Sequence, residues 1–254
     1  MTIEENAMGI SGEEAFAASN ACLAPDRTVK AEGQPGSVEF EAMCRRLDHR
    51  PLPYRFIKRL FDIAFSAVVV LIGLLPSLVL SVVLALDTKA FPIYTQVRAG
   101  AHGKPFRILK FRTMVADSDD VERYFTPEQF AEWKRERKVE RDPRITRVGR
   151  IVRTMSLDEL PQFINVFLGQ ISVIGPRAIT FDELEHFGED RALLLSVPPG
   201  ITGWWQCGPR NLATFENGLR QRIELQYVED ASLGRDIQIF FSTFKVMLVK
   251  RTGK

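Results

Sequence analysis

Two adjacent carboxylates, Asp158 and Glu159, are the residues of this chain best suited to chemistry. The surrounding sequence predicts a helix over residues 156–168, in which Ser156 and Glu159 have the spacing of a capping box. Consecutive helical residues project about 100° apart, so one carboxylate could attack while its neighbour holds a metal ion. A helix N-terminus stabilises negative charge, so we expect both to be ionised. The same pattern is also typical of acids that only cap a helix.

Basic residues accompany this pair, several of them in turns bounded by Gly and Pro. Arginine forks match phosphate oxygens in a bidentate fashion, so such turns indicate a phosphate or diphosphate site. Each arginine alone is most often a surface salt-bridge partner. The sequence has no Walker loop, no GxGxxG after a strand, no HExxH and no GxSxG. The basic residues in question are Lys110, Arg112, Arg144, Arg147, Arg150, Arg153, Arg177 and Arg210.

A run without a single charge, residues 63–86, is expected to hold this chemistry against a membrane. About twenty helical residues cross a bilayer core, so the run is long enough to span it. Pro76 removes a backbone hydrogen bond and predicts a kink near Ser77. Six bases in residues 45–59 favour the cytoplasmic side. Composition favours a helix that spans once; a re-entrant hairpin turning at Pro76 would instead keep both flanks in the cytoplasm.

The bulk composition limits the class of protein. The chain has 254 residues, room for one membrane element and one modest globular domain. Its 34 basic and 32 acidic residues give a net charge of +2, so nothing points to nucleic acid. Three scattered cysteines fit a reducing compartment. The first forty residues are polar and acidic, and we expect no signal peptide.

Three regions follow one another along the chain. Residues 1–50 predict a disordered or weakly ordered N-terminal tail. Residues 51–88 predict a membrane helix with a basic flank. Residues 89–254 predict the catalytic domain, which begins with a β-hairpin over residues 91–114. A final helix over residues 235–251 fits either an interfacial amphipathic helix or a helix packed in the core.

The chain carries an ordered set of motifs that makes its family recognisable. They are KRLFDIAFSAVVV, QVRAG, KFRTM, DPRITRVGRIVR, SLDELPQFINVFLGQISVIGPR and PGITGWWQ. In this order they resemble the bacterial sugar transferases, monotopic polyprenyl-phosphate phosphoglycosyl transferases of the exopolysaccharide-initiating type. The resemblance covers residues 55–254. It implies an α+β fold in which a re-entrant helix-break-helix enters one leaflet and a small catalytic domain lies on the cytoplasmic face of the bacterial inner membrane.

The resemblance also implies an activity. The family transfers a sugar-1-phosphate from a UDP-sugar to undecaprenyl phosphate, releases UMP and requires Mg²⁺. Its Asp-Glu dyad falls on Asp158 and Glu159. Asp158 would attack the β-phosphorus to form a covalent phosphosugar-enzyme, and Glu159 would ligate Mg²⁺. An aspartyl-phosphate intermediate splits one displacement between two anions into two steps, each with its charge neutralised by a metal.

Further substrate-binding residues are assigned by the resemblance alone. Two loops depart from the family pattern: Ala178 stands where a proline usually follows the GPR arginine, and Pro209 stands where a glycine precedes Arg-Asn. The first departure frees the backbone beside Arg177, so the placement of that arginine is less constrained. The residues assigned to substrate binding are Lys110, Arg112, Arg177, Gln206, Arg210 and Glu224.

Partners follow from the same resemblance. We expect a UDP-sugar, undecaprenyl phosphate, membrane lipid and downstream glycosyltransferases, with a homodimer plausible and nucleic acid excluded. One alternative is a catalytically weak membrane scaffold that recruits polysaccharide assembly enzymes. Another is a regulator that binds anionic lipid through the basic residues 134–153. The intact dyad and its flanking cations favour the enzyme.

Overall fold

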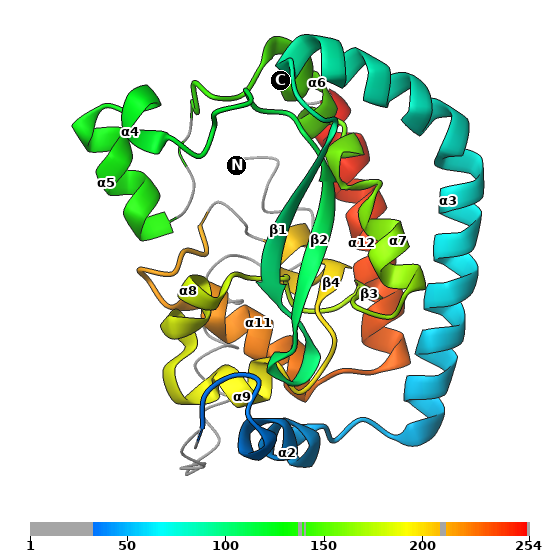
Figure 1. Cartoon of the computed structure of the whole chain (residues 1–254). Coiled ribbons are helices and arrows are strands. Elements are labelled where there is room, and N and C mark those ends of the chain that lie inside the picture. The colour runs from blue at the N-terminus through cyan, green and yellow to red at the C-terminus, as the bar shows by residue number, and fades with distance from the viewer. Residues whose placement is uncertain (1–32, 137–138, 140, 209–211, 253–254) are drawn as a thin grey trace, which may run out of the picture. The chain divides into compact units, whose positions relative to one another are not determined.

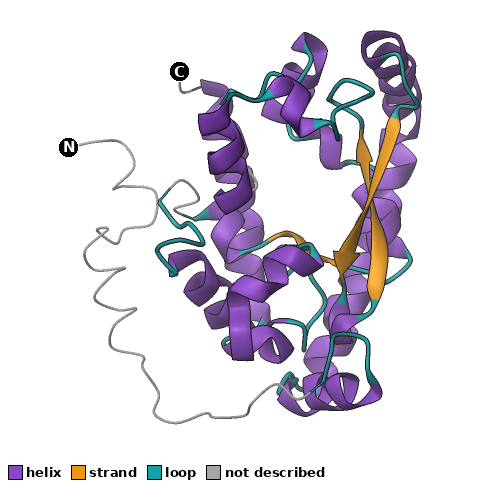
Figure 2. Cartoon of the chain, turned by 60° about the vertical axis from the view of Figure 1, so that its left-hand side comes forward, coloured by secondary structure: helices purple, strands orange, loops and turns teal. Residues whose placement is uncertain are grey.

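A computed structural model describes residues 33–136, 139, 141–208 and 212–252 (Figure 1). Helices and two small sheets mix along the described chain, as expected for an α+β fold (Figure 2). The strands are β1 (Ile93–Ala99), β2 (Pro105–Phe111), β3 (Ser172–Ile174) and β4 (Gly200–Thr202). The 3-10 turns are η1 (Ala101–Gly103), η2 (Leu157–Glu159) and η3 (Glu185–Asp190). The helices are α2 (Val38–Leu47), α3 (Leu52–Thr88), α4 (Val121–Tyr124), α5 (Pro127–Glu136), α6 (Arg147–Thr154), α7 (Gln162–Phe167), α8 (Phe181–Leu184), α9 (Arg191–Leu194), α10 (Trp204–Cys207), α11 (Leu219–Glu229) and α12 (Leu233–Thr252).

Strands β1 and β2 form the predicted antiparallel hairpin. Alternate residues of β2, such as Phe106 and Ile108, are buried, which is the pattern of a strand with one face on the core. The turn at η1 places His102 and Gly103 at positive φ, 61° and 77°. Because paired residues share a face, the register Tyr94↔Lys110 puts Tyr94, Gln96 and Arg98 on the face that carries Lys110.

The second sheet brings two distant loops together. Strands β3 and β4 pair in parallel, with Ser172 opposite Gly200. The approach is so close that a Cβ added to Gly200 would lie 2.1 Å from the backbone nitrogen of Gly175. Glycine is therefore required where the GPR loop and the PGIT loop meet. This contact fixes Arg177 beside Gly200, to which it is joined by an isolated β-bridge.

Helix α3 is long enough and apolar enough to cross a membrane. Only 6% of its most apolar 18-residue window is buried, so this helix offers its apolar side chains outward rather than to a protein core. Helical structure continues through Pro76, so the expected break of the helix is not found. The helix instead bends in its second half (Figure 1). A proline removes only one backbone hydrogen bond, which a long helix tolerates by bending.

A buried polar network ties the first turns of α3 to the catalytic domain. Asp236 accepts hydrogen bonds from Tyr54 Oη (2.8 Å), Lys58 Nζ (2.7 Å) and Tyr227 Oη (2.8 Å). Asp62, one turn further along α3, accepts hydrogen bonds from residues of β3. Buried charges are tolerated when paired and hydrogen-bonded in this way, and they fix how two elements meet. The membrane helix is therefore joined firmly to the strands beside the site.

Helix α2 corrects the expectation for residues 1–50. Residues 38–47 are helical, and Ser37 caps the helix by accepting a hydrogen bond from the Phe40 backbone nitrogen at 3.1 Å. Phe40 and Cys44 are 0% exposed and belong to a core cluster with residues of α8, η3 and α9. Its composition of Gly, Ala, Ser and Glu with little periodicity predicted weak order, but the packing of Phe40 and Cys44 against distant residues makes this part of the segment helical. Residues 1–32 lie outside the described residues.

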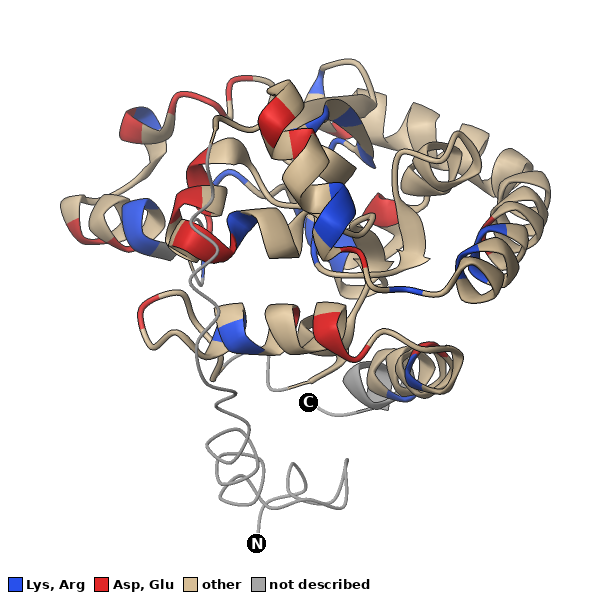
Figure 3. Ribbon diagram, turned by 90° about the horizontal axis from the view of Figure 1, so that it is seen from below, with Lys and Arg blue, Asp and Glu red and all other residues tan. Residues whose placement is uncertain are grey.

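Helix α12 combines both roles that its sequence allowed. Ile239 is 0% exposed in the main core, whereas Phe241 is 66% and Ile237 58% exposed. Phe240 packs edge-on against Phe65 of α3, at 5.4 Å between ring centroids. Figure 3 shows no Lys, Arg, Asp or Glu in the middle of α3, while such residues are spread over other elements of the described chain. The exposed apolar residues of α3 and α12 are thus suited to a lipid surface.

Candidate active site

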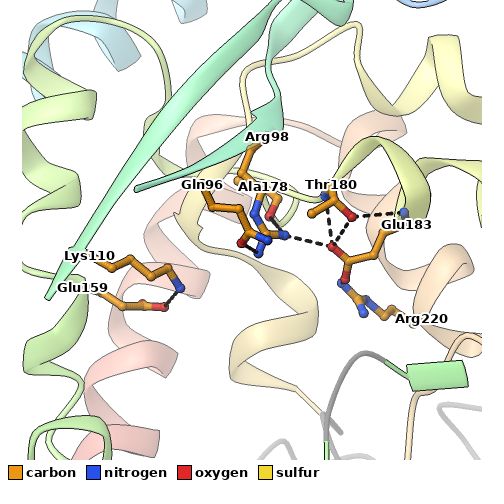
Figure 4. Close-up of polar contacts among 8 residues, drawn as sticks. All are labelled: Gln96, Arg98, Lys110, Glu159, Ala178, Thr180, Glu183 and Arg220. Atoms are coloured by element: carbon orange, nitrogen blue, oxygen red, sulfur yellow. Dashed lines mark hydrogen bonds and ion pairs between the residues drawn. The ribbon is translucent and has the colours of Figure 1, made fainter. Parts of the chain in front are cut away.

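The acidic pair lies in a 3-10 turn rather than at the start of a regular helix. Ser156 has a left-handed backbone (φ 56°), which prevents the predicted side-chain cap. Residues 157–159 form η2, and the α-helix begins only at Gln162. The predicted capping box is therefore wrong. The turn leaves Glu159 directed at Lys110 of β2, with its Oε1 3.4 Å from the lysine Nζ (Figure 4).

A pocket opens beside Glu159, between the hairpin, α7 and the two glycine loops. Three of its charged side chains are cations and one is a carboxylate, so an anion is the ligand that its charge favours. Lys110, Glu159 and Arg177 were predicted to be site residues, and the structure brings them together here. The pocket is lined by Arg98, Ile108, Lys110, Glu159, Gln162, Arg177, Ala178, Gly200 and Ile201.

The environment of Asp158 opposes the ionisation that the sequence predicted for both carboxylates of the dyad. Burial and the neighbouring charge of Glu159 raise the pKa of Asp158, against the opposing effects of Lys110 and Arg153. Burial lowers the pKa of Lys110, and the charge of Glu159 opposes that effect. Arg153 is held beside the dyad by a 2.7 Å hydrogen bond from its Nε to Thr113 Oγ1. Asp158 is thus a carboxylate whose ionisation depends on these cations.

The placement of Arg177 is fixed by its backbone. Its N–H donates to Glu224 Oε2 at 3.1 Å, and its guanidinium lies over the Trp205 ring at 5.7 Å. Ala178, which replaces the usual proline, is 6% exposed and accepts a hydrogen bond through its carbonyl from Arg98 Nη1 at 3.3 Å. These contacts hold the loop where the sequence suggested that it was less constrained.

Glu224 does not line the pocket. It is 2% exposed, and its Oε2 accepts a hydrogen bond from the backbone of Arg177, so it supports the loop that carries this arginine. Burial raises the pKa of Glu224 to about 7, although Arg220 and Arg177 oppose the shift. Sequence alone gave no sign of this burial, since an acid on a helix is usually exposed.

Replacing Glu224 with glutamine is expected to stabilise the protein more at about pH 8 than at about pH 5. With a folded pKa of about 7 against a usual 4.5, the folded state keeps a proton that the unfolded chain has released. Stability of the unchanged protein therefore falls as pH rises through this window, and glutamine removes the loss. The measurement is the unfolding midpoint of the unchanged protein and of Glu224→Gln between about pH 5 and pH 8. If the two midpoints change with pH in parallel, the prediction is contradicted.

Two other predicted binding residues, Arg112 and Gln206, do not line the pocket, and a third lies outside the described residues. Arg112 donates from Nε to the Phe91 carbonyl at 3.0 Å and lies over the Tyr94 ring, on the exposed end of the hairpin. Gln206 lies in α10, and neither its Oε1 nor its Nε2 has a partner among the described residues. Arg210 lies outside the described residues. Of these, Gln206 is a buried polar group near the pocket's glycine loop.

Sequence reasoning missed Arg98 and Gln162. Arg98 was visible only inside the QVRAG motif, where one arginine among many carried no distinguishing signal. The hairpin register could have found it, because strand alternation places it on the same face as Lys110. Gln162 follows Pro161 in the motif SLDELPQ, three residues after Glu159, and it faces the pocket from the first turn of α7.

A divalent cation fits the dyad if substrate phosphates and water complete its ligands. The described residues contain no group of three or more His, Cys, Asp or Glu that could hold a metal. Mg²⁺, however, is commonly bound by one or two carboxylates together with substrate phosphates and water. Asp158 and Glu159, next to a pocket lined by three cations, match that donor set.

Comparisons with known proteins agree on one family. A sequence model described as bacterial sugar transferase matches residues 53–250. The chain is 41% identical over 202 residues to a UDP-galactose-lipid carrier transferase of Erwinia amylovora, with 78% of this chain and 42% of that protein covered. It is similarly 41% identical to an undecaprenyl-phosphate galactose phosphotransferase of Salmonella typhimurium, covering 78% and 42%. The exopolysaccharide production protein ExoY of Rhizobium meliloti is 36% identical, covering 76% and 86%. The chain thus spans less than half of the first two relatives and most of the third.

Proposed function

Because the chain belongs to the bacterial sugar transferase family, we propose that it transfers a sugar-1-phosphate from a UDP-sugar to undecaprenyl phosphate, as an initiating step of exopolysaccharide synthesis. The observation that carries this proposal is the acidic pair beside a cation-lined pocket, joined to an apolar helix. The relatives' names supply the lipid carrier and the sugar phosphate. The pocket's charge suits the diphosphate that such a donor would bring.

The first step is a displacement by Asp158. A carboxylate oxygen of Asp158 attacks the β-phosphorus of the donor, and the bond between that phosphorus and its bridging oxygen breaks. UMP leaves with the electron pair, and an aspartyl-phosphosugar remains. Only ionised Asp158 can attack, and Lys110 and Arg153 favour that form against burial. Activity should therefore fall on the acid side as this carboxyl becomes protonated.

The second step regenerates the enzyme. A phosphate oxygen of the lipid attacks the same phosphorus, the bond to Asp158 breaks, and the sugar leaves on a lipid diphosphate. Cations of the pocket, Lys110 and Arg177, neutralise phosphate charge in both steps. Glu159 would hold Mg²⁺ together with substrate phosphates, and the ion would supply charge neutralisation at the transferred phosphoryl group. Glu159 also orients Lys110 through their 3.4 Å ion pair.

Removal of divalent cations is expected to abolish UMP release. Glu159→Gln should raise the Mg²⁺ concentration needed for half-maximal activity by roughly tenfold or more, because a ligand is lost. The measurement is UMP release against Mg²⁺ concentration. The matched control is Glu185→Gln, an exposed residue of η3. Identical Mg²⁺ curves for Glu159→Gln and the unchanged protein would contradict the assignment.

We also propose that α3 enters the membrane from the cytoplasmic face and returns to it. The bases of residues 45–59 precede the apolar run, and the catalytic domain needs a nucleotide sugar made in the cytoplasm. The bend in the second half of α3 supports a re-entrant path (Figure 1). Single cysteines at the exposed positions Val38 and Phe91, in a background lacking the native cysteines, test it. Labelling of both from the cytoplasmic side supports this path, and labelling from opposite sides contradicts it.

The experiment for the whole proposal is UMP release by purified protein in nanodiscs. It receives Mg²⁺, undecaprenyl phosphate and a panel of UDP-sugars. Release that depends on the lipid and on one sugar supports the enzyme and identifies the donor. If folded protein releases no UMP from any donor, the alternative of a membrane scaffold for later glycosyltransferases is favoured instead.

A further inference from the structure

Arg98 lines the pocket and is held by its own set of partners (Figure 4). Its Nη1 donates to Glu183 Oε2 at 2.8 Å and to the Ala178 carbonyl at 3.3 Å, and its Nη2 donates to Gln96 Oε1 at 2.6 Å. These contacts use three of the five N–H donors of a guanidinium. Its buried Nε has no partner among the described residues. Arg98 is therefore fixed in orientation while it retains donor capacity toward a ligand.

Gln162 offers a second buried donor in the pocket lining. Its side chain is 2% exposed, and its Nε2 has no partner among the described residues. A buried amide donor left without an acceptor costs free energy of about 1–3 kcal/mol. Its position in the pocket lining indicates that a ligand supplies the acceptor.

The net charge of the pocket favours a ligand that carries more than one negative charge. Arg98, Lys110 and Arg177 carry three positive charges, and Glu159 carries one negative charge. The pKa of Arg98 is lowered by burial, an effect that the charge of Arg177 adds to and that Glu183 opposes. Three cations held together at one recess are stabilised by an anion of matching charge, and a diphosphate provides it with several acceptor oxygens.

The direction of approach distinguishes the nucleotide donor from the lipid. Helix α3 packs on α7 and α7 on β2, so the membrane element lies on one side of the hairpin. Arg98 lies on β1 and reaches Glu183 of α8, on the other side (Figure 1). A phosphate attached to a lipid would enter from the α3 side, so Arg98, which lies on the side of α8, is placed for the nucleotide donor.

We propose that Arg98, assisted by Gln162, binds the donor's diphosphate oxygens and makes the site selective for a nucleoside diphosphate over a monophosphate. This inference rests on the proposed function, because it assigns residues to the donor of that reaction. The diphosphate would then lie between Arg98 and the Lys110–Glu159 ion pair, which line the same pocket. Arg98 acts on the substrate directly, and its ion pair with Glu183 keeps the guanidinium in place.

Binding of UDP, UMP and uridine to the full-length protein in nanodiscs, without lipid acceptor, tests the proposal by calorimetry. Arg98→Gln should weaken UDP binding by roughly tenfold or more and leave uridine binding unchanged. Gln162→Leu should weaken UDP binding in the same direction by a smaller factor. Arg107→Gln, an exposed arginine on the opposite face of the hairpin, is the matched control and should bind UDP normally.

Four results would overturn the proposal, and the last of them would overturn the proposed function as well. Unchanged UDP affinity in Arg98→Gln, with turnover in the unchanged protein, contradicts this inference but not the proposed function. An equal loss of UDP, UMP and uridine binding would show that Arg98 maintains the structure of the site and does not contact the diphosphate. A raised KM for undecaprenyl phosphate with normal UDP binding assigns it to the lipid. If Arg98→Gln does not fold, Arg98→Lys retains the charge beside Glu183 and should lower UDP affinity selectively. Absence of UDP binding and of turnover in the unchanged protein would reject both proposals.

Discussion

Asp158→Asn is expected to lower lipid-dependent UMP release by on the order of a thousandfold or more while the protein remains folded. Asparagine keeps the shape of the side chain but provides no carboxylate oxygen to attack phosphorus. Burial raises the pKa of Asp158, so the charged form is costly in the folded state. Removing the charge should therefore leave the unfolding temperature equal or higher, which separates a lost nucleophile from a lost fold.

The matched control for this substitution is Asp230→Asn. Asp230 ends α11, where its half-exposed side chain pairs with Arg235 at 3.1 Å, away from the pocket. Exposed pairs contribute little to stability, so this variant should keep its activity and its unfolding temperature. Residual activity in Asp158→Asn within a factor of about ten of the unchanged protein would be inconsistent with a nucleophile at this position.

Phe40→Ala is expected to lower the free energy of unfolding by about 3–5 kcal/mol. The Phe40 side chain is 0% exposed in a cluster with Leu184, Phe187 and Leu195, and its removal would leave a cavity. The same cluster underlies α8, which carries the Glu183 that holds Arg98. Activity should therefore fall at temperatures well below those that unfold the unchanged protein. Thermal and denaturant unfolding in detergent, followed by near-UV circular dichroism, measure the effect.

Val38→Ala provides the comparison on the same helix. Val38 is 80% exposed at the first turn of α2, so its truncation should change stability by less than about 0.5 kcal/mol. Similar small effects for Phe40→Ala and Val38→Ala would show that α2 is not part of the folded core. Since the family match begins at residue 53, this test also asks whether a segment outside the family region supports the site.

The parts of the fold that follow from local pattern were predictable from the sequence. Alternation of β-formers around a glycine turn predicted the hairpin of β1 and β2, and an uncharged run predicted α3. Motif order singled out Lys110, Glu159 and Arg177, which the structure brings together in one pocket. These signals are short in range, and tertiary contacts did not override them.

Other features depend on contacts between residues far apart in the chain. The left-handed backbone of Ser156 replaces a capping box that fitted the local spacing. Burial of Glu224 comes from the loop that carries Arg177, 47 positions earlier in the chain. Arg98 enters the site only through the strand pairing and the reach to Glu183. Such long-range packing leaves no periodic mark in the sequence.

Trapping the aspartyl-phosphosugar tests the central claim most directly. The protein is incubated with Mg²⁺ and its UDP-sugar donor without undecaprenyl phosphate, quenched and digested, and the peptide containing Asp158 is weighed by mass spectrometry. We predict a mass increase equal to one phosphosugar on Asp158, absent from Asp158→Asn and lost when undecaprenyl phosphate is added. An unmodified peptide in a preparation that still turns over with lipid would contradict the covalent mechanism and favour direct transfer.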